Sequence, residues 1–507
     1  MRRKRADAAL GPVGVQATMT DHGPRYARLI AWALLSVCTL AALTRPVIAY
    51  DDWWYHLPFS SYLFNIGHGA ASFHLDPLLT ARWLGFPRAW EWVQGLAWFV
   101  SGSLYAVIVP QLILASAYFY CVCRTQRIPP AWLILGFFAS PMLLTHFEGL
   151  YTDLPAAFCT AIGCFLAVGL LTRTKPAENA AAPFPWRRAA CAIAAFGLAG
   201  NIKYQALLSV WCICAIVALL CLQVPDMPRR FRASVLLVLA TAALLAASSA
   251  ASNLVHYGNP FFPLEIKLLG KSVFAGPESP EMDAGYPTYL LRGSHPVSPP
   301  EPVNFLLSAS ELDWTMRGVA PWYNMDAVTG RTPRRGAPSR MGGWGALFVL
   351  VNACLLAVQA WRLRREPDLQ QRLLVACAVL VVLATAFLPR AHELRYWLYI
   401  PLLVLPVNLR YLSRSPYRAL VPGARVVLMA YGVAEAVLSP ESDLLTARTL
   451  SMPALRATIP QEVMQSLRAT GRYCGPTDDW LFRYSEAVTG VPGILSRVAQ
   501  DCAAVQK

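Results

Sequence analysis

The chain has 507 residues, of which 56% are hydrophobic and 14% are charged, and its formal net charge is +15. Water-soluble domains usually carry about 25% charged residues, so this composition excludes an ordinary soluble protein. The basic residues cluster in short gaps between apolar runs, which favours a membrane surface, and not nucleic acid, as the partner of the positive charge.

Long apolar runs follow a basic amino-terminal segment, residues 1–27. A membrane-spanning helix needs about 20 mostly apolar residues, and about eleven runs qualify. In chain order they are 28–49, 99–122, 131–148, 153–172, 189–202, 204–223, 233–254, 344–361, 373–389, 394–409 and 423–439. The first run exceeds the core of a cleaved signal peptide, so we expect it to remain as a helix. The sequence therefore predicts an all-α polytopic membrane protein.

The charges between the runs predict the orientation of the chain. Arginine and lysine gather in the amino-terminal segment and in alternate gaps, whereas the other short gaps carry few of them. The positive-inside rule then places the amino terminus inside, and an odd number of spans places the carboxyl terminus outside. The bias towards arginine and alanine is typical of a GC-rich bacterial genome, so we expect a multi-pass protein of the bacterial cytoplasmic (inner) membrane.

Three segments on the outer side are longer than a turn. Residues 50–98 are rich in aromatic and apolar residues and predict short interfacial helices, because Trp and Tyr favour that level of the membrane. Residues 255–343 form a loop rich in Pro and Gly, and residues 441–507 form a small polar tail. In an oxidising outer compartment Cys474 and Cys502 of this tail could form a disulfide, and two unrelated thiols are the alternative.

The first candidate site directly follows the first apolar run, where Asp51 and Asp52 lie at the water boundary. Partial desolvation there can raise the pKa of a carboxyl group towards the range of a general base. On a helix His56 would share a face with Asp52, which slightly favours Asp52 as the base. An interfacial aromatic belt, in which the acids only face water, explains the same residues equally well.

A second candidate is the short outer turn that contains Glu148 and Asp153. Asp153 directly precedes Leu154-Pro155, so capping of the next helix is one explanation. The functional alternative is that Asp153 joins Asp51 or Asp52 around a divalent metal ion or an acceptor group.

Two cations near the outer face are further candidates. Lys203 is nearly the only lysine at membrane depth, where ionisable groups are costly and often functional. It could hold a phosphate as a point charge, or it could simply extend to the interface. Arg395, next to Tyr396, could bind a phosphate or diphosphate through two parallel hydrogen bonds, with Glu393 as a structural partner instead. The residues 258–263 predict a helix end and a turn.

Soluble catalytic signatures such as a phosphate-binding glycine loop, Gly-x-Ser-x-Gly or His-Glu-x-x-His do not occur in the sequence. An enzyme acting outside would therefore need an activated donor carried in the membrane. The layout of residues 28–440 resembles the GT-C superfamily of membrane glycosyltransferases, which take sugars from polyprenyl-phosphate donors. The motifs of the resemblance are Tyr50-Asp51-Asp52-Trp53, Thr152-Asp153-Leu154-Pro155, Gly258-Asn259-Pro260-Phe261-Phe262-Pro263, Gly342-Gly343-Trp344-Gly345 and Arg395-Tyr396.

Two features depart from the superfamily. Many members have a single Asp, or Asp-Glu, where this chain has Asp51-Asp52, so the resemblance leaves open which acid is the base. The small tail also lacks the large outer domain of oligosaccharyltransferases.

The resemblance implies an inverting transfer of a sugar to a lipid, glycan or protein acceptor on the outer face. It implies Asp51 or Asp52 as the base, Lys203 or Arg395 on the leaving phosphate, and a divalent metal ion near Asp153. The substrate-binding set expected with them is His56, Glu148, Lys203, Arg395 and Tyr396. The alternatives are a transporter or lipid flippase, a non-catalytic membrane scaffold, and a ligase that uses lipid-diphosphate oligosaccharides.

Overall fold

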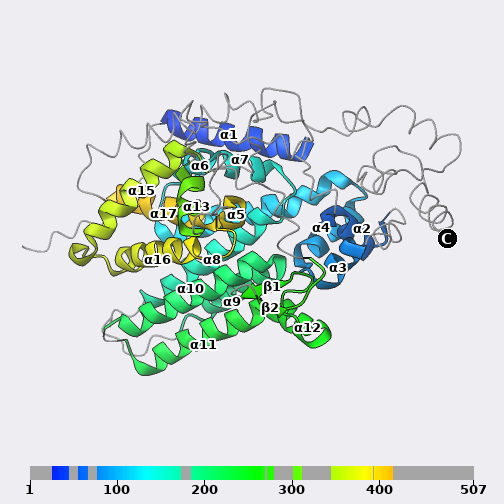
Figure 1. Cartoon of the computed structure of the whole chain (residues 1–507). Coiled ribbons are helices and arrows are strands. Elements are labelled where there is room, and N and C mark those ends of the chain that lie inside the picture. Colours follow the sequence, from blue (N-terminus) through cyan, green and yellow to red (C-terminus); the bar gives the residue numbers. More distant parts are fainter. Residues whose placement is uncertain are drawn as a thin grey trace, which may run out of the picture.

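The computed structural model describes residues 25–44, 55–66, 77–172, 184–225, 227–268, 271–278, 301–310, 344–391 and 393–414. This part of the chain is predominantly helical, as the sequence predicts (Figure 1). Two short strands, β1 (Ile266–Leu268) and β2 (Lys271–Phe274), pair antiparallel within the long loop expected after the seventh apolar run. Helix α13 (Glu301–Ser310) lies in the same loop.

Five helical segments are long and apolar enough to cross a membrane, or seven if each of two bent pairs is one span. The five are α1 (Arg25–Thr44), the 3₁₀ helix η4 (Leu104–Ile108) with α5 (Val109–Gln126), α8 (Asp153–Leu171), α10 (Tyr204–Gln223) and α16 (Leu369–Ala386). The bent pairs are α6 (Pro130–Phe138) with α7 (Pro141–Glu148), and α11 (Arg229–Ala246) with α12 (Ser248–Tyr257). Helices α9 (Trp186–Ile202), α15 (Ala346–Trp361) and α17 (Tyr399–Arg414) complete the bundle.

The first ten predicted apolar runs each overlap a helix, and the eleventh, 423–439, lies outside the described residues. The total of eleven spans therefore stays a prediction. The runs 189–202 and 204–223 are two helices, as expected, because the backbone is extended at Lys203 between them. The run 131–148 differs from the expected single span, since α6 and α7 meet at 95°. Ser140 is extended there because Pro141 disfavours the helical conformation of the residue before it.

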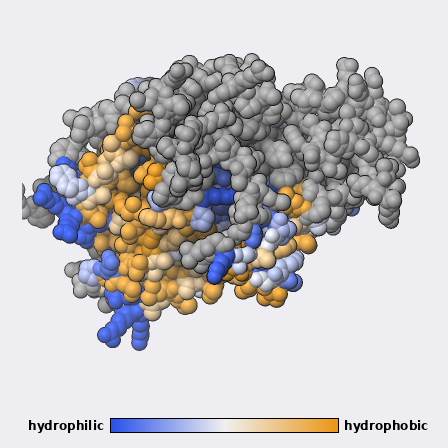
Figure 2. Space-filling view, viewed as in Figure 1, coloured by the Kyte–Doolittle hydropathy of each residue, from blue (hydrophilic) through white to orange (hydrophobic). Residues whose placement is uncertain are grey.

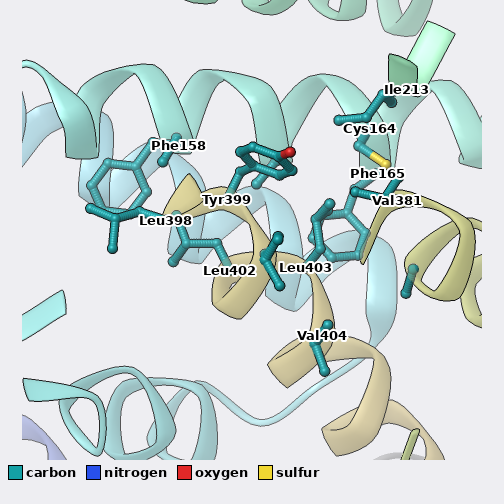
Figure 3. Close-up of a cluster of buried hydrophobic side chains, with 14 of the residues drawn as sticks. Phe158, Cys164, Phe165, Ile213, Val381, Leu398, Tyr399, Leu402, Leu403 and Val404 are labelled. Atoms are coloured by element: carbon teal, nitrogen blue, oxygen red, sulfur yellow. The ribbon is translucent and has the colours of Figure 1, made fainter. Parts of the chain in front are cut away.

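Helix α8 is the centre of the bundle. In its most apolar 18-residue window, 94% of the residues are buried. Figure 3 shows its Phe158, Cys164 and Phe165 among apolar side chains of α10, α16 and α17. The hydroxyl of Tyr399 is satisfied within this core by Thr385, at 2.6 Å. A helix that is apolar on all sides is expected to be surrounded by protein, and α8 is.

A separate group of short helices lies at one end of the bundle, at the right of Figure 1. It consists of α2 (Leu57–Leu63), α3 (Pro77–Gly85) and α4 (Ala89–Ser101), which we call the α2–α4 layer. These helices occupy the segment where the sequence predicts short interfacial helices. Their position at a membrane interface stays a prediction.

A close backbone contact at Gly85 helps to join the α2–α4 layer to the bundle. The carbonyl oxygen of Gly85 accepts hydrogen bonds from the Tyr204 hydroxyl, at 2.5 Å, and from the Asn253 amide, at 2.7 Å. Both donors also reach the carbonyl oxygen of Phe262. A Cβ atom on Gly85 would lie 2.2 Å from that oxygen, so only glycine allows the layer to approach so closely. Residues 258–263 are a helix end and turn, as predicted, with Gly258 in the left-handed conformation.

A group of charged residues lies at the end of the bundle opposite the α2–α4 layer. Asp368 caps α16 and forms ion pairs with Arg410, at 2.6 Å, and with Arg414 of α17. In Figure 2 the surface of the bundle is largely apolar, and hydrophilic residues gather at the left margin, where α16 and the α10–α11 connection lie in Figure 1. An apolar belt between polar ends is the surface expected of a membrane protein.

Candidate functional site

An ion pair between Asp153 and Lys203 is the centre of the candidate site. The ammonium Nζ of Lys203 lies 2.6 Å from Oδ1 of Asp153. Asp153 is the first residue of α8, where the positive end of the helix dipole favours a carboxylate. Lys203 is the extended residue between α9 and α10, so the break in that run is what aims the lysine at α8.

Arg395 and Tyr396 lie beside this ion pair, in the 3₁₀ helix η7 (Leu394–Trp397). Nζ of Lys203 is 4.6 Å from the centre of the Tyr396 ring, and the Arg395 guanidinium is 4.9 Å from the same ring. The guanidinium also donates a hydrogen bond of 3.1 Å to the Tyr396 hydroxyl. The Tyr396 ring therefore lies against both cations, and cation–π attraction favours this arrangement.

The turn before Asp153 is fixed by two glutamines. The amide of Gln111 donates to the carbonyl oxygens of His146, Phe147 and Gly149 at the end of α7. The amide of Gln94, on α4, donates to the carbonyl oxygen of Leu150 at 3.0 Å. These bonds satisfy carbonyl groups that a helix end leaves open, and they hold the turn in place.

Further aromatic contacts line this turn. The ring of His146 stacks on Tyr151 at 5.0 Å, and the Arg395 guanidinium lies 5.9 Å from the Tyr151 ring. Glu148 is buried at the end of α7, and its side chain hydrogen-bonds Cys38 of α1. Glu393 lies 3.8 Å from Arg395, so it is the structural partner that the sequence offered as an alternative.

His56 lies in the α2–α4 layer. It is buried, and its Nδ1 lies 2.6 Å from Oε1 of Glu91, which is also buried. Asp51 and Asp52 lie outside the described residues, as do Cys474 and Cys502. The roles expected of those four residues therefore stay predictions.

The metal ion expected near Asp153 has no ligand cluster in the part of the chain that the structure describes. No group of three or more His, Cys, Asp and Glu side chains that could hold a metal occurs among those residues. The direct partner of Asp153 is a cation instead. The arrangement fits charge pairing, whereas a metal site needs several anionic or neutral ligands.

The sequence identified Asp153, Lys203, Arg395 and Tyr396, and the structure brings these four together. It missed Glu91 and Tyr151. A signal for Glu91 was present, because it is the one charged residue of a largely apolar and aromatic helix, α4. An isolated acid in such a helix usually faces water, and only the fold shows that this one is buried against His56.

The site can bind an anion beside a hydrogen-bond acceptor. Lys203 and Arg395 supply positive charge, and Tyr151 and Tyr396 supply flat faces. Oδ2 of Asp153 is buried and has no hydrogen-bond partner among the described residues, so it can accept a bond from a bound hydroxyl. Fold and site together define a multi-pass helical membrane protein with a charged, aromatic site at one end of its bundle.

No protein-family model and no curated protein matches this chain. The fold is similar to crystal structures of ArnT from Cupriavidus metallidurans, in the apo state and bound to undecaprenyl phosphate. Both are 12% identical to this chain with a TM-score of 0.46, and the alignments cover 94% and 95% of this chain and 74% of ArnT.

Proposed function

We propose that the chain is a membrane glycosyltransferase. It would transfer a sugar from a polyprenyl-phosphate donor to a lipid, glycan or protein acceptor at the extracytoplasmic face, with inversion at the anomeric carbon. The observation that carries the proposal is the placement of Lys203 and Arg395 around one tyrosine, beside Asp153, at the end of an apolar bundle.

The donor class follows from the charges and from their surroundings. A phosphate ester needs cations, and the site offers a lysine as a point charge and an arginine with a planar fork of donors. A polyprenyl chain needs apolar surface, which the lipid-facing helices supply. Undecaprenyl phosphate, which one ArnT structure contains, belongs to the same chemical class.

The reaction would proceed by in-line attack. The acceptor hydroxyl attacks the anomeric carbon, and the bond from that carbon to the phosphate oxygen breaks. Lys203 and Arg395 stabilise the charge that develops on the leaving phosphate. Asp51 or Asp52 acts as the base, and Asp153 orients Lys203 through their ion pair.

Sugar transfer by the reconstituted protein tests this proposal. Purified protein in liposomes is given candidate polyprenyl-phosphate sugars, and labelled sugar on the acceptor is counted. We expect Lys203→Met to lower kcat at least about 100-fold, because one lost charge-stabilising donor typically costs that much. Lys271→Met, which removes an exposed lysine of β2, is the matched control and keeps wild-type activity.

The outcomes separate the functions. Transfer at the wild-type rate by Lys203→Met, or by all of Asp51→Asn, Asp52→Asn and Asp153→Asn, would overturn the mechanism. Movement of the lipid across the bilayer without any sugar transfer would favour the flippase instead.

A further inference from the structure

The α2–α4 layer contains a buried acid–base pair. Nδ1 of His56 and Oε1 of Glu91 are 2.6 Å apart, and the two residues are only 5% and 2% exposed. The second atom of each group, Nε2 of His56 and Oε2 of Glu91, is buried without a hydrogen-bond partner among the described residues. A carboxylate that accepts from Nδ1–H leaves Nε2 as the basic nitrogen of the ring. The geometry is that of a base and the group that orients it.

Other charged groups surround this pair. Arg82 of α3 lies 5.3 Å from the ring of Tyr55, which contacts the His56 ring at 4.2 Å. Glu278 compensates the charge of Arg82 and accepts a hydrogen bond of 3.0 Å from it. Arg88, just before α4, interacts electrostatically with Glu91. Glu91 is therefore the acidic partner of both His56 and Arg88.

The pair lies close to the candidate site. Glu91 and Gln94 are three residues apart on α4, so they share one face of that helix. Gln94 donates to Leu150 in the turn that leads to Asp153. The layer is also joined to the site through Phe86, whose ring is 6.1 Å from that of Tyr204, the residue after Lys203. Glu91 is therefore about one helical turn along α4 from the residue that contacts the turn before Asp153.

We propose that His56 and Glu91 form the proton-accepting dyad of the transfer reaction, a role that rests on the proposed glycosyltransferase function. The acceptor O–H bond breaks as the new bond to the anomeric carbon forms. The proton of that hydroxyl ends on Nε2 of His56. The bond between the anomeric carbon and the phosphate oxygen breaks, and the leaving phosphate keeps the electron pair of that bond. Glu91 is a positioning residue that holds the ring by Nδ1–H and offsets the charge of the imidazolium.

Two variants separate this role from simple packing. His56→Asn keeps a donor for Glu91 but lacks Nε2, and Glu91→Gln keeps the shape but lacks the charge. In the liposome assay with the donor that wild type uses, we expect His56→Asn to lower kcat about 100-fold, with the KM for donor unchanged. We expect Glu91→Gln to lower kcat as well, again with the KM for donor unchanged, because a neutral amide does not offset the charge that develops on the ring. His256→Asn, on the exposed face of α12, is the control.

The results distinguish this dyad from the function on which it rests. If Lys203→Met is inactive while His56→Asn keeps the wild-type kcat and pH profile, the dyad is overturned and the glycosyltransferase stands. A rise in KM alone would also overturn it, since that would make His56 a binding residue. If wild type transfers no sugar from any donor, both proposals fail. Thermal midpoints of each variant in detergent confirm that the fold is intact.

Discussion

At the scale of single residues, the site depends on charges that compensate each other. Asp153 is almost fully buried, and its compensation comes from Lys203, fifty positions later in the chain. A buried carboxylate without its partner would have to be neutralised or desolvated at large cost. The two residues therefore have a structural role as well as the chemical one proposed for them.

Removing only one partner should be worse for stability than removing both. We expect Asp153→Asn to lower the free energy of unfolding by about 3 kcal/mol, because Lys203 then loses its buried partner. The double variant Asp153→Asn with Lys203→Met should recover most of that stability and still transfer no sugar. Chemical denaturation in detergent measures the first effect and the liposome assay measures the second. Additive losses in the double variant would contradict this coupling.

At the scale of helices, α16 and α17 are joined by charge at the end of the bundle opposite the candidate site. Burial raises the pKa of the Asp368 carboxyl, but the hydrogen bond from Arg410 and the charges of Arg410 and Arg414 outweigh it. The pKa therefore lies below its ordinary value. A depressed pKa means that the folded state binds the proton more weakly than the unfolded chain does.

This shift predicts a pH dependence with a definite sign. The stabilisation from Asp368 is complete above the ordinary pKa of an aspartate, about 4, and is lost as the pH falls through the lower folded value. The thermal midpoint of wild type should therefore exceed that of Asp368→Asn at pH 7, and the difference should shrink below about pH 4. A constant difference across that range would show that the ion pairs contribute nothing. Because Arg414 is partly exposed, salt should reduce the difference as well.

Sequence reasoning succeeded where a single residue was anomalous in its surroundings. Lys203 was identified because a lysine at membrane depth is costly, and the structure places it beside Asp153, another residue identified from the sequence. Their direct pairing was not predicted, because a contact across fifty residues depends on how helices pack. The bend between α6 and α7 was missed for a local reason. The sequence stays apolar on both sides of Pro141, so hydropathy alone predicts one continuous helix. The break follows from the extended backbone at Ser140.

At the scale of the whole molecule, orientation in the membrane is the main prediction that remains. If each of the first ten predicted runs crosses the membrane and the amino terminus is inside, α17 ends inside at Arg414. The predicted eleventh span, 423–439, then carries the chain outside. A reporter fused after residue 507 should therefore be active outside, and one fused after residue 414 should be active inside. The same compartment for both fusions would remove the last span, and the Cys474–Cys502 disulfide would lose its oxidising surroundings.

The central position of α8 has a consequence for the synthesis of the protein. Asp153 leaves the ribosome well before Lys203 does, so the nascent helix carries a carboxylate whose counter-charge has not yet been made. Helix α8 is surrounded by protein in the finished fold, and its neighbours α9 and α10 are the next helices to be synthesised. We therefore expect α8 to reach its final position only after α10 has been synthesised. Helices α8, α9 and α10 would then enter the membrane together.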